Sequence, residues 1–260
     1  MRATLPAMPR RHERRQPTRT MAMSSTINSL LRVAGLAGLL ALAGCASGPA
    51  ADPRDPLEPL NRSLYQFNVD VDRALLKPVA NAYVEVTPAP LRTGVNNFFD
   101  NLRDGWSAVN GVLQLRPREA TENGMRFVFN STFGLAGVLD VASEMGLERT
   151  TLDFGMTLGR WGVPDGPYLM LPLLGPSTLR DTAALPVDGQ GNAVGQIGHI
   201  PTRNGLRALS IVDQRAGLLR AGDMLQEAAL DPYSFLRDSY LQRRHSQIGV
   251  TPPEERYDLE

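Results

Sequence analysis

One residue of this sequence carries a clear chemical signal, because Cys45 is the only cysteine in 260 residues. It follows Leu42-Ala43-Gly44, which close an apolar stretch that begins at Val33. A basic start, a short apolar segment and small residues before a cut site are typical of a secretory signal. A cysteine directly after the small pair makes the pattern a lipobox, in which the sulfur receives a diacylglycerol group and the chain is cut before the cysteine. The sequence therefore predicts covalent lipid on Cys45, and a buried cysteine that ends a short helix is the alternative.

The lipobox divides the chain before any fold is considered. Residues 1–44 are predicted to be a signal peptide, with its true start at Met21 or Met23 because the arginine-rich leader before them is unusually long. Residues 45–54 are then a lipidated tether, residues 55–246 a helical domain and residues 247–260 a disordered tail. The apolar stretch is shorter than the ~20 residues that a membrane-spanning helix needs. We therefore expect lipid to hold the chain at the membrane.

The other reactive side chains do not assemble into a catalytic or metal site. Beyond Cys45 the only histidines are His199 and His245, and the sequence has no His-x-x-x-His or Cys/His cluster of the kind that binds zinc. It also has no Gly-x-Ser-x-Gly elbow and no Gly-x-x-x-x-Gly-Lys loop. We expect no enzyme, no catalytic residues, no metal and no cofactor other than the lipid on Cys45. A dyad of either histidine with a distant serine stays an alternative.

The charge balance after the signal narrows the classes of partner. Removing the seven arginines and one glutamate of residues 1–44 from totals of 27 and 27 leaves 20 basic and 26 acidic side chains. A net acidic chain without clustered basic residues argues against nucleic acid and against electrostatic docking on anionic lipid. Without a second cysteine, no internal disulfide can form.

Apolar residues recur at steps of three and four through most of the chain, which predicts a mostly α-helical fold. Asp55-Pro56 is predicted to begin the first helix, with Asp55 as its cap, and Pro78 to stop it. No segment shows convincing strand alternation. We place helices at 55–77, 91–115, 117–133, a short one through 154–158 whose start has the capping-box spacing of Thr150 and Asp153, 178–185, 206–219 and 232–241, with a loop at 187–201.

The longest periodic segment, residues 91–115, has two interpretations. Its apolar side includes Leu91, Phe98 and Leu113, and its other side carries Asp104 and Asn110. The usual interpretation is a helix whose apolar side faces a protein core. The second is a helix lying in a membrane interface, where a wide apolar side also serves.

A different kind of segment follows at 159–176. It contains four glycines and four prolines, yet most of its other side chains are apolar. Because a solvent-exposed loop is normally polar, this irregular backbone is expected to pack against something or to line a cavity.

Eight stretches in order resemble the MlaA lipoproteins, also called VacJ. The first is Asp55-Pro-Leu-Glu-Pro-Leu-Asn-Arg-Ser-Leu-Tyr-Gln-Phe-Asn68. The others are Asn97-Phe-Phe-Asp-Asn-Leu102, Arg126-Phe-Val-Phe-Asn-Ser-Thr-Phe-Gly134, Gly137-Val-Leu-Asp-Val-Ala142, Phe154-Gly-Met-Thr-Leu-Gly-Arg-Trp-Gly-Val163, Gly166-Pro-Tyr-Leu-Met-Leu-Pro172, Gly175-Pro-Ser-Thr-Leu-Arg-Asp181 and Asp231-Pro-Tyr233. The resemblance covers residues 55 to about 245, and 187–205 shows no family motif.

The resemblance implies a ring of amphipathic helices around a channel, anchored by lipid in the outer membrane and facing the periplasm. It implies a protein that takes misplaced phospholipid from the outer leaflet and passes it to a periplasmic carrier protein, commonly beside a trimeric porin, without hydrolysis. Ala46 also favours the outer membrane, since it is not the aspartate that retains many lipoproteins in the inner membrane. A structural envelope lipoprotein without lipid transport is the alternative, and a lipase the more distant one.

If a channel is present, the segment 159–176 is our candidate for its lining or gate. A passage for lipid needs polar groups for the headgroup and apolar groups for the tails, and irregular backbone at membrane depth is tolerated around a cavity. We place on or beside the channel Trp161, Tyr168 and Leu171, with Gly162 and Gly166 giving the loop freedom to move. The alternative is that these residues only fill the gap between helices.

Overall fold

The computed structural model describes residues 52–249, except the side chains of residues 225–228, and it is mostly helical, as predicted. Cys45, the signal segment and residues 250–260 lie outside the described residues. The helices are α2 (Glu58–Val71), α3 (Lys77–Val86), α4 (Ala89–Leu113), α5 (Pro117–Thr132), α6 (Val141–Glu144), α7 (Phe154–Arg160), α8 (Leu179–Gly191), α9 (Ile200–Gly217), α10 (Leu219–Ala228) and α11 (Pro232–Ile248). Two strands, β1 (Tyr168–Leu171) and β2 (Gly175–Thr178), complete the fold with the short helical turns Asp72–Leu76 and Ala193–Gln196.

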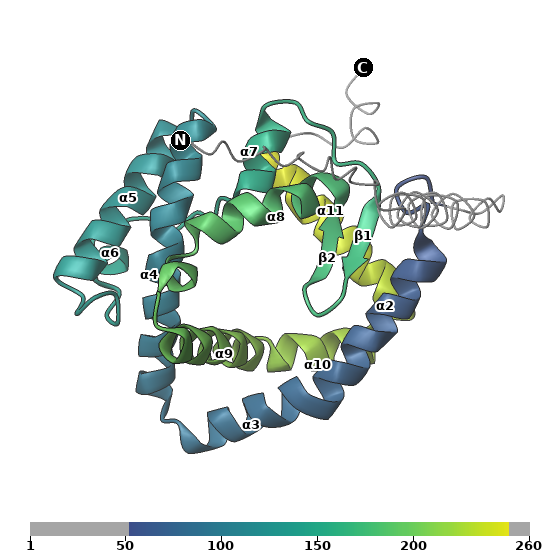
Figure 1. The fold of residues 1–260 in the computed structure, drawn as a ribbon, viewed down its shortest axis with the longest axis horizontal. Helices are drawn as coiled ribbons and strands as arrows, with labels where there is room; N and C mark the ends of the chain where they lie inside the picture. The colour runs from purple at the N-terminus through teal and green to yellow at the C-terminus, as the bar shows by residue number, and fades with distance from the viewer. Residues whose placement is uncertain (1–51, 250–260) are drawn as a thin grey trace, which may run out of the picture. The chain divides into compact units, whose positions relative to one another are not determined.

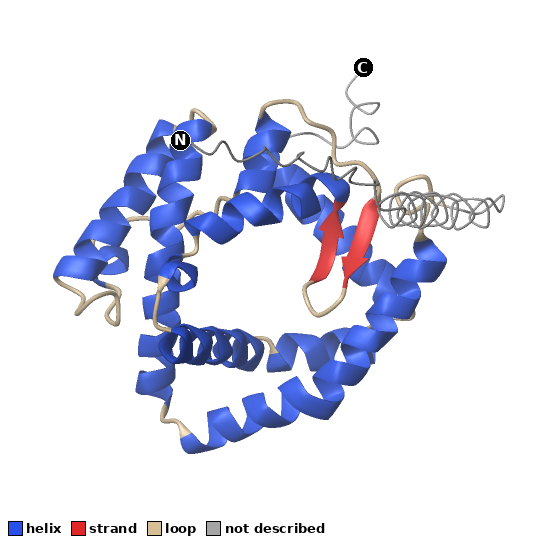
Figure 2. Ribbon diagram, in the orientation of Figure 1, coloured by secondary structure: helices blue, strands red, loops and turns tan. Residues whose placement is uncertain are grey.

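These elements follow one another around a ring (Figure 1). The helices α2 and α3 form one side, α4 the next, and α8 with the strands closes the course, as the colouring by secondary structure also shows (Figure 2). Inside this course α9 packs along α3, and outside it α5 packs along α4. The C-terminal helix α11 contacts α7 and β2. The ring therefore brings segments far apart in the sequence into contact.

The predicted stop at Pro78 is wrong, because the chain stays helical from Glu58 to Val86. The turn Asp72–Leu76 is π-helical, and the Lys77 amide donates to the Asp72 carbonyl five residues back. A proline inside a helix lacks an amide donor and crowds the carbonyl four residues earlier. The wider turn just before Pro78 makes room for that ring, so the helix passes through the proline and does not end.

The prediction of a fold without strands is also wrong. The strands β1 and β2 pair as an antiparallel hairpin, with Tyr168 opposite Thr178. Side chains of α2 take the place of a third strand. Asn61 accepts from the Met170 amide at 2.8 Å and donates to the Tyr168 carbonyl at 3.1 Å. Asn68, two turns further along α2, accepts from the Leu173 amide at 2.7 Å. The hairpin thus has amide partners that no strand periodicity could reveal.

The hairpin covers a small aromatic core. Tyr168, Met170, Tyr233 and Leu241 are buried together, with partly buried side chains of α2 and α11 around them. Asp55, predicted as a helix cap, instead turns inward, and its carboxylate accepts from the Tyr233 hydroxyl at 2.5 Å. This core joins β1 to α2 and α11 and fixes that part of the ring.

Side chains cap the starts of α7, α8 and α11. Thr178 caps α8 and Asp231 caps α11, each through its side chain. At α7 the cap is Asp153, which accepts from the Met156 amide, so the predicted capping box starting at Thr150 is wrong. The helix α8 also continues past Leu185 through Pro186 to Gly191, which shortens the predicted loop at 187–201.

Candidate functional site

The helices α4 and α5 pack through polar side chains. Arg126 of α5 bonds to Asp104 of α4, and Asn101 of α4 bonds to Ser131 of α5. The other buried polar side chains of these helices are Ser107 and Asn110 of α4, Gln114 directly after it, and Asn123 and Asn130 of α5, and of these Ser107, Asn110 and Gln114 bond to residues 152–157. The backbones approach closely where Gly111 meets Ala120, because a Cβ on Gly111 would lie 2.8 Å from the Ala120 Cα. In the sequence analysis, Asp104 and Asn110 lie on the polar side of the helix at 91–115, opposite its apolar side. The buried side of this helix is therefore its polar side.

Arg126 is the centre of that polar interior, with 1 % of its side chain exposed. Its guanidinium donates to Asp140 at 2.8 Å, to the Leu147 carbonyl at 2.6 Å and to Asp104 at 3.2 Å. Burial alone would raise the pKa of Asp140, but hydrogen bonds from Ser143, Asn130 and Arg126 hold it at about 2. Burial raises the pKa of Asp104 despite the nearby arginines. The charges are thus paired and hydrogen-bonded, as buried charges must be.

The apolar side chains of the same region face outward. The core-facing interpretation of 91–115 is wrong, since Leu91, Val109 and Leu113 are exposed and Phe98 is only half-buried. Further exposed apolar side chains on α4, on α5 and on the turns that follow them are Val112, Leu115, Met125, Phe127, Val128, Phe133, Leu135, Val138 and Leu139. An apolar surface of this kind marks a site of contact with a membrane, a protein or a ligand.

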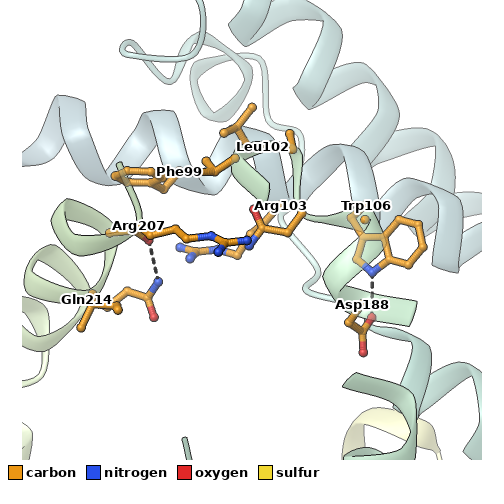
Figure 3. Close-up of a pocket in the computed structure, with 13 residues that line it drawn as sticks. Phe99, Leu102, Arg103, Trp106, Asp188, Arg207 and Gln214 are labelled. Atoms are coloured by element: carbon orange, nitrogen blue, oxygen red, sulfur yellow. Dashed lines mark hydrogen bonds between the residues drawn. The ribbon is translucent and has the colours of Figure 1, made fainter. Parts of the chain in front are cut away.

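A pocket of about 540 Å³ lies where α4, the end of α8 and α9 meet (Figure 3). Its volume is within the range of small-molecule sites, about 300–1,000 Å³. The α4 side chains that line it are Phe99, Leu102, Arg103 and Trp106, the α8 end contributes Asp188 and Gly191, and α9 contributes Arg207, Ser210, Ile211 and Gln214. The lining is amphipathic, with apolar walls and charged groups in one cavity.

Trp106 forms a fixed wall of this pocket. Its indole Nε1 donates to Asp188 at 2.8 Å, an interaction drawn in Figure 3, and the same carboxylate oxygen accepts from the Phe154 amide at 2.9 Å. The indole also lies against the backbone of Gly191, so closely that no side chain fits there. Burial raises the pKa of Asp188, although these two hydrogen bonds act in the opposite direction. The wall is held in place before any ligand arrives.

The two arginines of the pocket differ in their partners. Arg103 forms an ion pair with Asp100 on its own helix, and Asp100 also binds Arg149 at 2.6 Å. Arg207 is exposed on α9, and among the described side chains no carboxylate forms an ion pair with it. In Figure 3 the two guanidinium ends point toward each other. Guanidinium groups that converge in a cavity can bind an anion.

The residues of 159–176 that the sequence proposes for a channel do not line this pocket. Trp161 and Gly162 follow α7, where the Trp161 indole donates to the Leu113 carbonyl at 3.0 Å. Tyr168 is fully buried in the core under the hairpin, and Leu171 ends β1 half-buried. Gly166 and Gly162 both have positive φ, +67° and +91°. The position of Tyr168 therefore fits the alternative in which these residues fill the gap between helices.

Residues 53–247 match the MlaA lipoprotein family, three quarters of the chain. The chain belongs to the MlaA lipoprotein family.

Three relatives show the extent of the similarity. The intermembrane phospholipid transport system lipoprotein MlaA of Escherichia coli strain K12 is 39 % identical over 187 residues, 70 % of this chain and 74 % of that protein. Its namesake from Haemophilus influenzae is 32 % identical over 198 residues, 73 % of this chain and 77 % of that protein. An uncharacterised protein of Rickettsia typhi is 33 % identical over 189 residues, 72 % of this chain and 75 % of that protein.

A solved structure has the same fold. It comes from work on the structural basis for maintenance of bacterial outer membrane lipid asymmetry, and it is 35 % identical to this chain. The match has a TM-score of 0.66 and covers 75 % of this chain and 98 % of the other. The helical ring of residues 52–249 is thus the MlaA fold.

Within that fold the described residues lack two features. No helix among residues 52–249 has the length and hydrophobicity to cross a membrane. In the same residues, His, Cys, Asp and Glu do not gather into any group of three or more that could hold a metal ion.

Sequence reasoning missed the pocket of this MlaA chain. Phe99, Arg103 and Trp106 recur at steps of three and four on α4, and Arg207, Ile211 and Gln214 do so on α9. Each stripe mixes charged and apolar residues, which is the available signal. The partner stripe lies about a hundred residues away, and periodicity within one helix does not show which helix it faces.

Proposed function

We propose that this chain removes phospholipid from the outer leaflet of the outer membrane and passes it toward the periplasm, so that the lipid asymmetry of that membrane is kept. The observation that carries the proposal is the family membership, since relatives at 39 % and 32 % identity are named intermembrane phospholipid transport system lipoproteins. The solved structure with this fold comes from work on outer membrane lipid asymmetry.

The packing of α4 and α5 supports a position in lipid. In water, a helix normally buries its apolar side chains and exposes its polar ones. Here Asn, Asp, Gln and Arg side chains are buried while Val112, Val128 and Phe133 are exposed. This order is stable where the surroundings are apolar, as they are among acyl chains. Helices too short or too polar to cross the membrane can still lie in one leaflet.

The anchor in this proposal is a lipid on Cys45, at the outer membrane and facing the periplasm. Each buried methylene contributes about 0.8 kcal/mol, and stable attachment takes more than one chain. Cys45→Ser should therefore leave a soluble or uncleaved protein and abolish transport. Fractionation of the variant and wild type measures this, and a Cys45→Ser chain that fractionates normally with outer membranes contradicts the anchor.

The partners in this proposal are a trimeric porin and a soluble periplasmic carrier of lipid. No catalytic step is needed, because the lipid moves intact. Cross-linking from Val128→Cys and Phe133→Cys, in membranes, should recover porin subunits if this apolar surface meets protein. Recovery of lipid adducts alone from both positions would leave the surface to the membrane and contradict the porin contact there.

The decisive experiment is complementation of a Gram-negative strain that lacks its own MlaA lipoprotein. Expression of this chain should restore a low outer-leaflet phospholipid level, measured by enzymatic labelling of surface lipid, and resistance to detergent with chelator. Mass spectrometry of the purified chain should find intact phospholipid and no lysophospholipid. Normal expression with unchanged surface phospholipid and no bound lipid would favour a structural envelope lipoprotein, whereas steady release of lysophospholipid would indicate a lipase.

A further inference from the structure

We infer that the pocket between α4, the end of α8 and α9 binds the phosphate group of a glycerophospholipid, with Arg103 and Arg207 on the phosphate and Phe99, Leu102 and Trp106 along the first part of its chains. The inference rests on the proposed function, which requires that lipid passes through the protein but does not say which residues hold its headgroup. It assigns that role to side chains outside the segment 159–176.

The charge distribution around the pocket points to an anion. In the polar interior of α4 and α5, Asp100, Asp104 and Asp140 are shared among Arg103, Arg126 and Arg149. Arg207 comes from a different helix and adds a positive charge that this network does not balance. Asp188 also lines the pocket, but one of its oxygens is already bound by Trp106 and the Phe154 amide. The guanidinium of Arg207 therefore has bonding capacity left for a ligand, and so does that of Arg103, which binds Asp100 through one nitrogen.

The walls point to a lipid among the possible phosphates. A sugar phosphate or a free phosphate would need several polar partners, because its other oxygens would otherwise be buried without hydrogen bonds. Ser210, Gln214 and Asn192 offer polar partners in the pocket, but the larger part of its lining is apolar and comes from the rings of Phe99 and Trp106 and the aliphatic side chains of Leu102 and Ile211. Phe99 is 5 % exposed, so part of this wall is already dry. A phosphate that continues into hydrocarbon matches both halves of the cavity.

The two tryptophans of the chain allow a direct test. Trp161 lies outside the pocket and is exposed, so Trp161→Phe leaves Trp106 as the only tryptophan. Its fluorescence in the purified full chain would be titrated with dihexanoylphosphatidylglycerol, with dihexanoylglycerol, which lacks the phosphate, and with inorganic phosphate. We expect the phospholipid to change the emission with saturation, the neutral glyceride to bind at least about tenfold more weakly, and inorganic phosphate to compete only weakly.

The same titration is repeated on variants at Arg207 and on a control variant with an equal change of charge. Arg207→Glu should weaken phospholipid binding by about tenfold or more, and Arg207→Lys should restore most of it, since a point charge still meets the phosphate. The control is Arg243→Glu, an equal charge change at an exposed position on α11 outside the pocket. If Arg207→Glu does not fold, Arg207→Gln replaces it.

Each outcome decides the assignment. Equal binding of phospholipid and neutral glyceride, or equal affinity of the Arg207 and Arg243 variants, overturns the phosphate site. Inorganic phosphate that binds as tightly as the phospholipid overturns the lipid and leaves a free-phosphate site. If the Trp106 signal does not respond while intact phospholipid still copurifies and surface lipid is still cleared, the headgroup lies elsewhere and the proposed function stands. If lipid neither copurifies nor is cleared from the surface, the proposed function itself fails.

Discussion

The α4–α5 pair and the hairpin region, formed by β1, β2, α2 and α11, bury different kinds of side chain. Between α4 and α5 the interior consists of amide, carboxylate and guanidinium groups around Arg126. Under the hairpin the interior combines a cluster of aromatic and aliphatic side chains around Tyr168 and Tyr233 with buried polar groups such as Asp55 and Asn61. The α4–α5 pair buries mainly polar side chains, whereas the hairpin region also buries an apolar cluster.

This difference suits the two regions to different surroundings, water for the hairpin region and an apolar medium for the α4–α5 pair. A core of tyrosines and leucines forms by leaving water, so it holds together in any aqueous compartment. A polar interior gains little from leaving water, because its groups exchange hydrogen bonds with water for hydrogen bonds with one another. It is favoured when the outer surface lies in an apolar medium. We therefore expect the hairpin region to provide stability in water and the α4–α5 pair to provide contact with lipid.

The largest expected effect comes from placing a carboxylate on an apolar side chain in each region. Leu241→Asp puts a charge into the hairpin core and should lower the free energy of unfolding by about 4 kcal/mol or more. Val128→Asp, on α5, should change the same quantity by no more than about 0.5 kcal/mol, because the side chain is exposed. Chemical denaturation measures both.

The same two variants separate membrane contact from stability. Binding to phospholipid vesicles should fall for Val128→Asp, since a charge replaces an apolar contact at the lipid surface. Global unfolding of Val128→Asp in detergent-free buffer would mean that this side of α5 packs on protein, and the comparison between the two regions would then collapse.

A smaller effect is expected from the charged interior of α4 and α5. Arg126→Met keeps much of the side-chain length but leaves Asp140 and Asp104 with Arg149 as their one shared arginine, and should lower the free energy of unfolding by about 3 kcal/mol or more. Arg118→Met on the same helix is the control, since that side chain is 72 % exposed and its ion pairs are at the surface. Similar stabilities for the two variants would show that the buried network is dispensable.

The pH dependence of stability tests the same interior through its carboxylates, whereas Arg126→Met tests it through the arginine. The pKa of Asp140 is about 2 in the fold against 3.8 for the free side chain. A depressed pKa stabilises the fold above about pH 4, and this contribution, below about 2 kcal/mol because water screens a partly exposed carboxylate, is lost as the pH falls toward 2. Asp104 has a raised pKa, so it opposes the trend by binding its proton more readily in the fold. The stability difference between wild type and Asp140→Asn isolates Asp140, and it should shrink between pH 4 and pH 2. A difference that is constant over this range contradicts the assignment.

Sequence periodicity predicts the helices but not which side of each is buried. The alternation of apolar and polar residues in 91–115 is correct, and the helix Ala89–Leu113 follows it. Periodicity shows only that a helix has two unlike sides, and it carries no information about the medium outside. The interfacial interpretation already fits an apolar side of this width. The decision between the two came from Asp104 and Asn110, which are buried together with Arg126.

Contacts over long sequence separations explain what could not be predicted. The hairpin at 168–178 depends on Asn61 and Asn68, about a hundred residues earlier, for its amide partners. The helix through Pro78 depends on a π-helical turn that no propensity scale encodes. The pocket needs residues of α4 and α9 in one place. The hairpin and the pocket form only when the ring closes, and the periodicity of a single segment does not predict that closure.

The smallest expected effect concerns the segment that joins the two regions. This segment runs from Trp161, whose indole donates to the Leu113 carbonyl, to Tyr168 at the start of β1. Gly162 has a φ of +91° and open space around its Cα, so Gly162→Ala meets no atom and changes only the backbone preference. That strain should lower the free energy of unfolding by about 1 kcal/mol. Proline is unsuitable at this position because its ring fixes φ near −65° and would break the turn, although stiffening by proline is the change that the sequence alone suggests.

Mobility of this joining segment predicts a second result for the same variant. If movement near Gly162 is needed for lipid to pass, Gly162→Ala should raise outer-leaflet phospholipid at a normal level of protein in the outer membrane. Gly198→Ala is the matched control, because that loop glycine has open space and no positive φ. Surface phospholipid at the wild-type level in Gly162→Ala cells, together with the expected loss of about 1 kcal/mol, would assign the segment to the structure of the ring and remove it from the transport step.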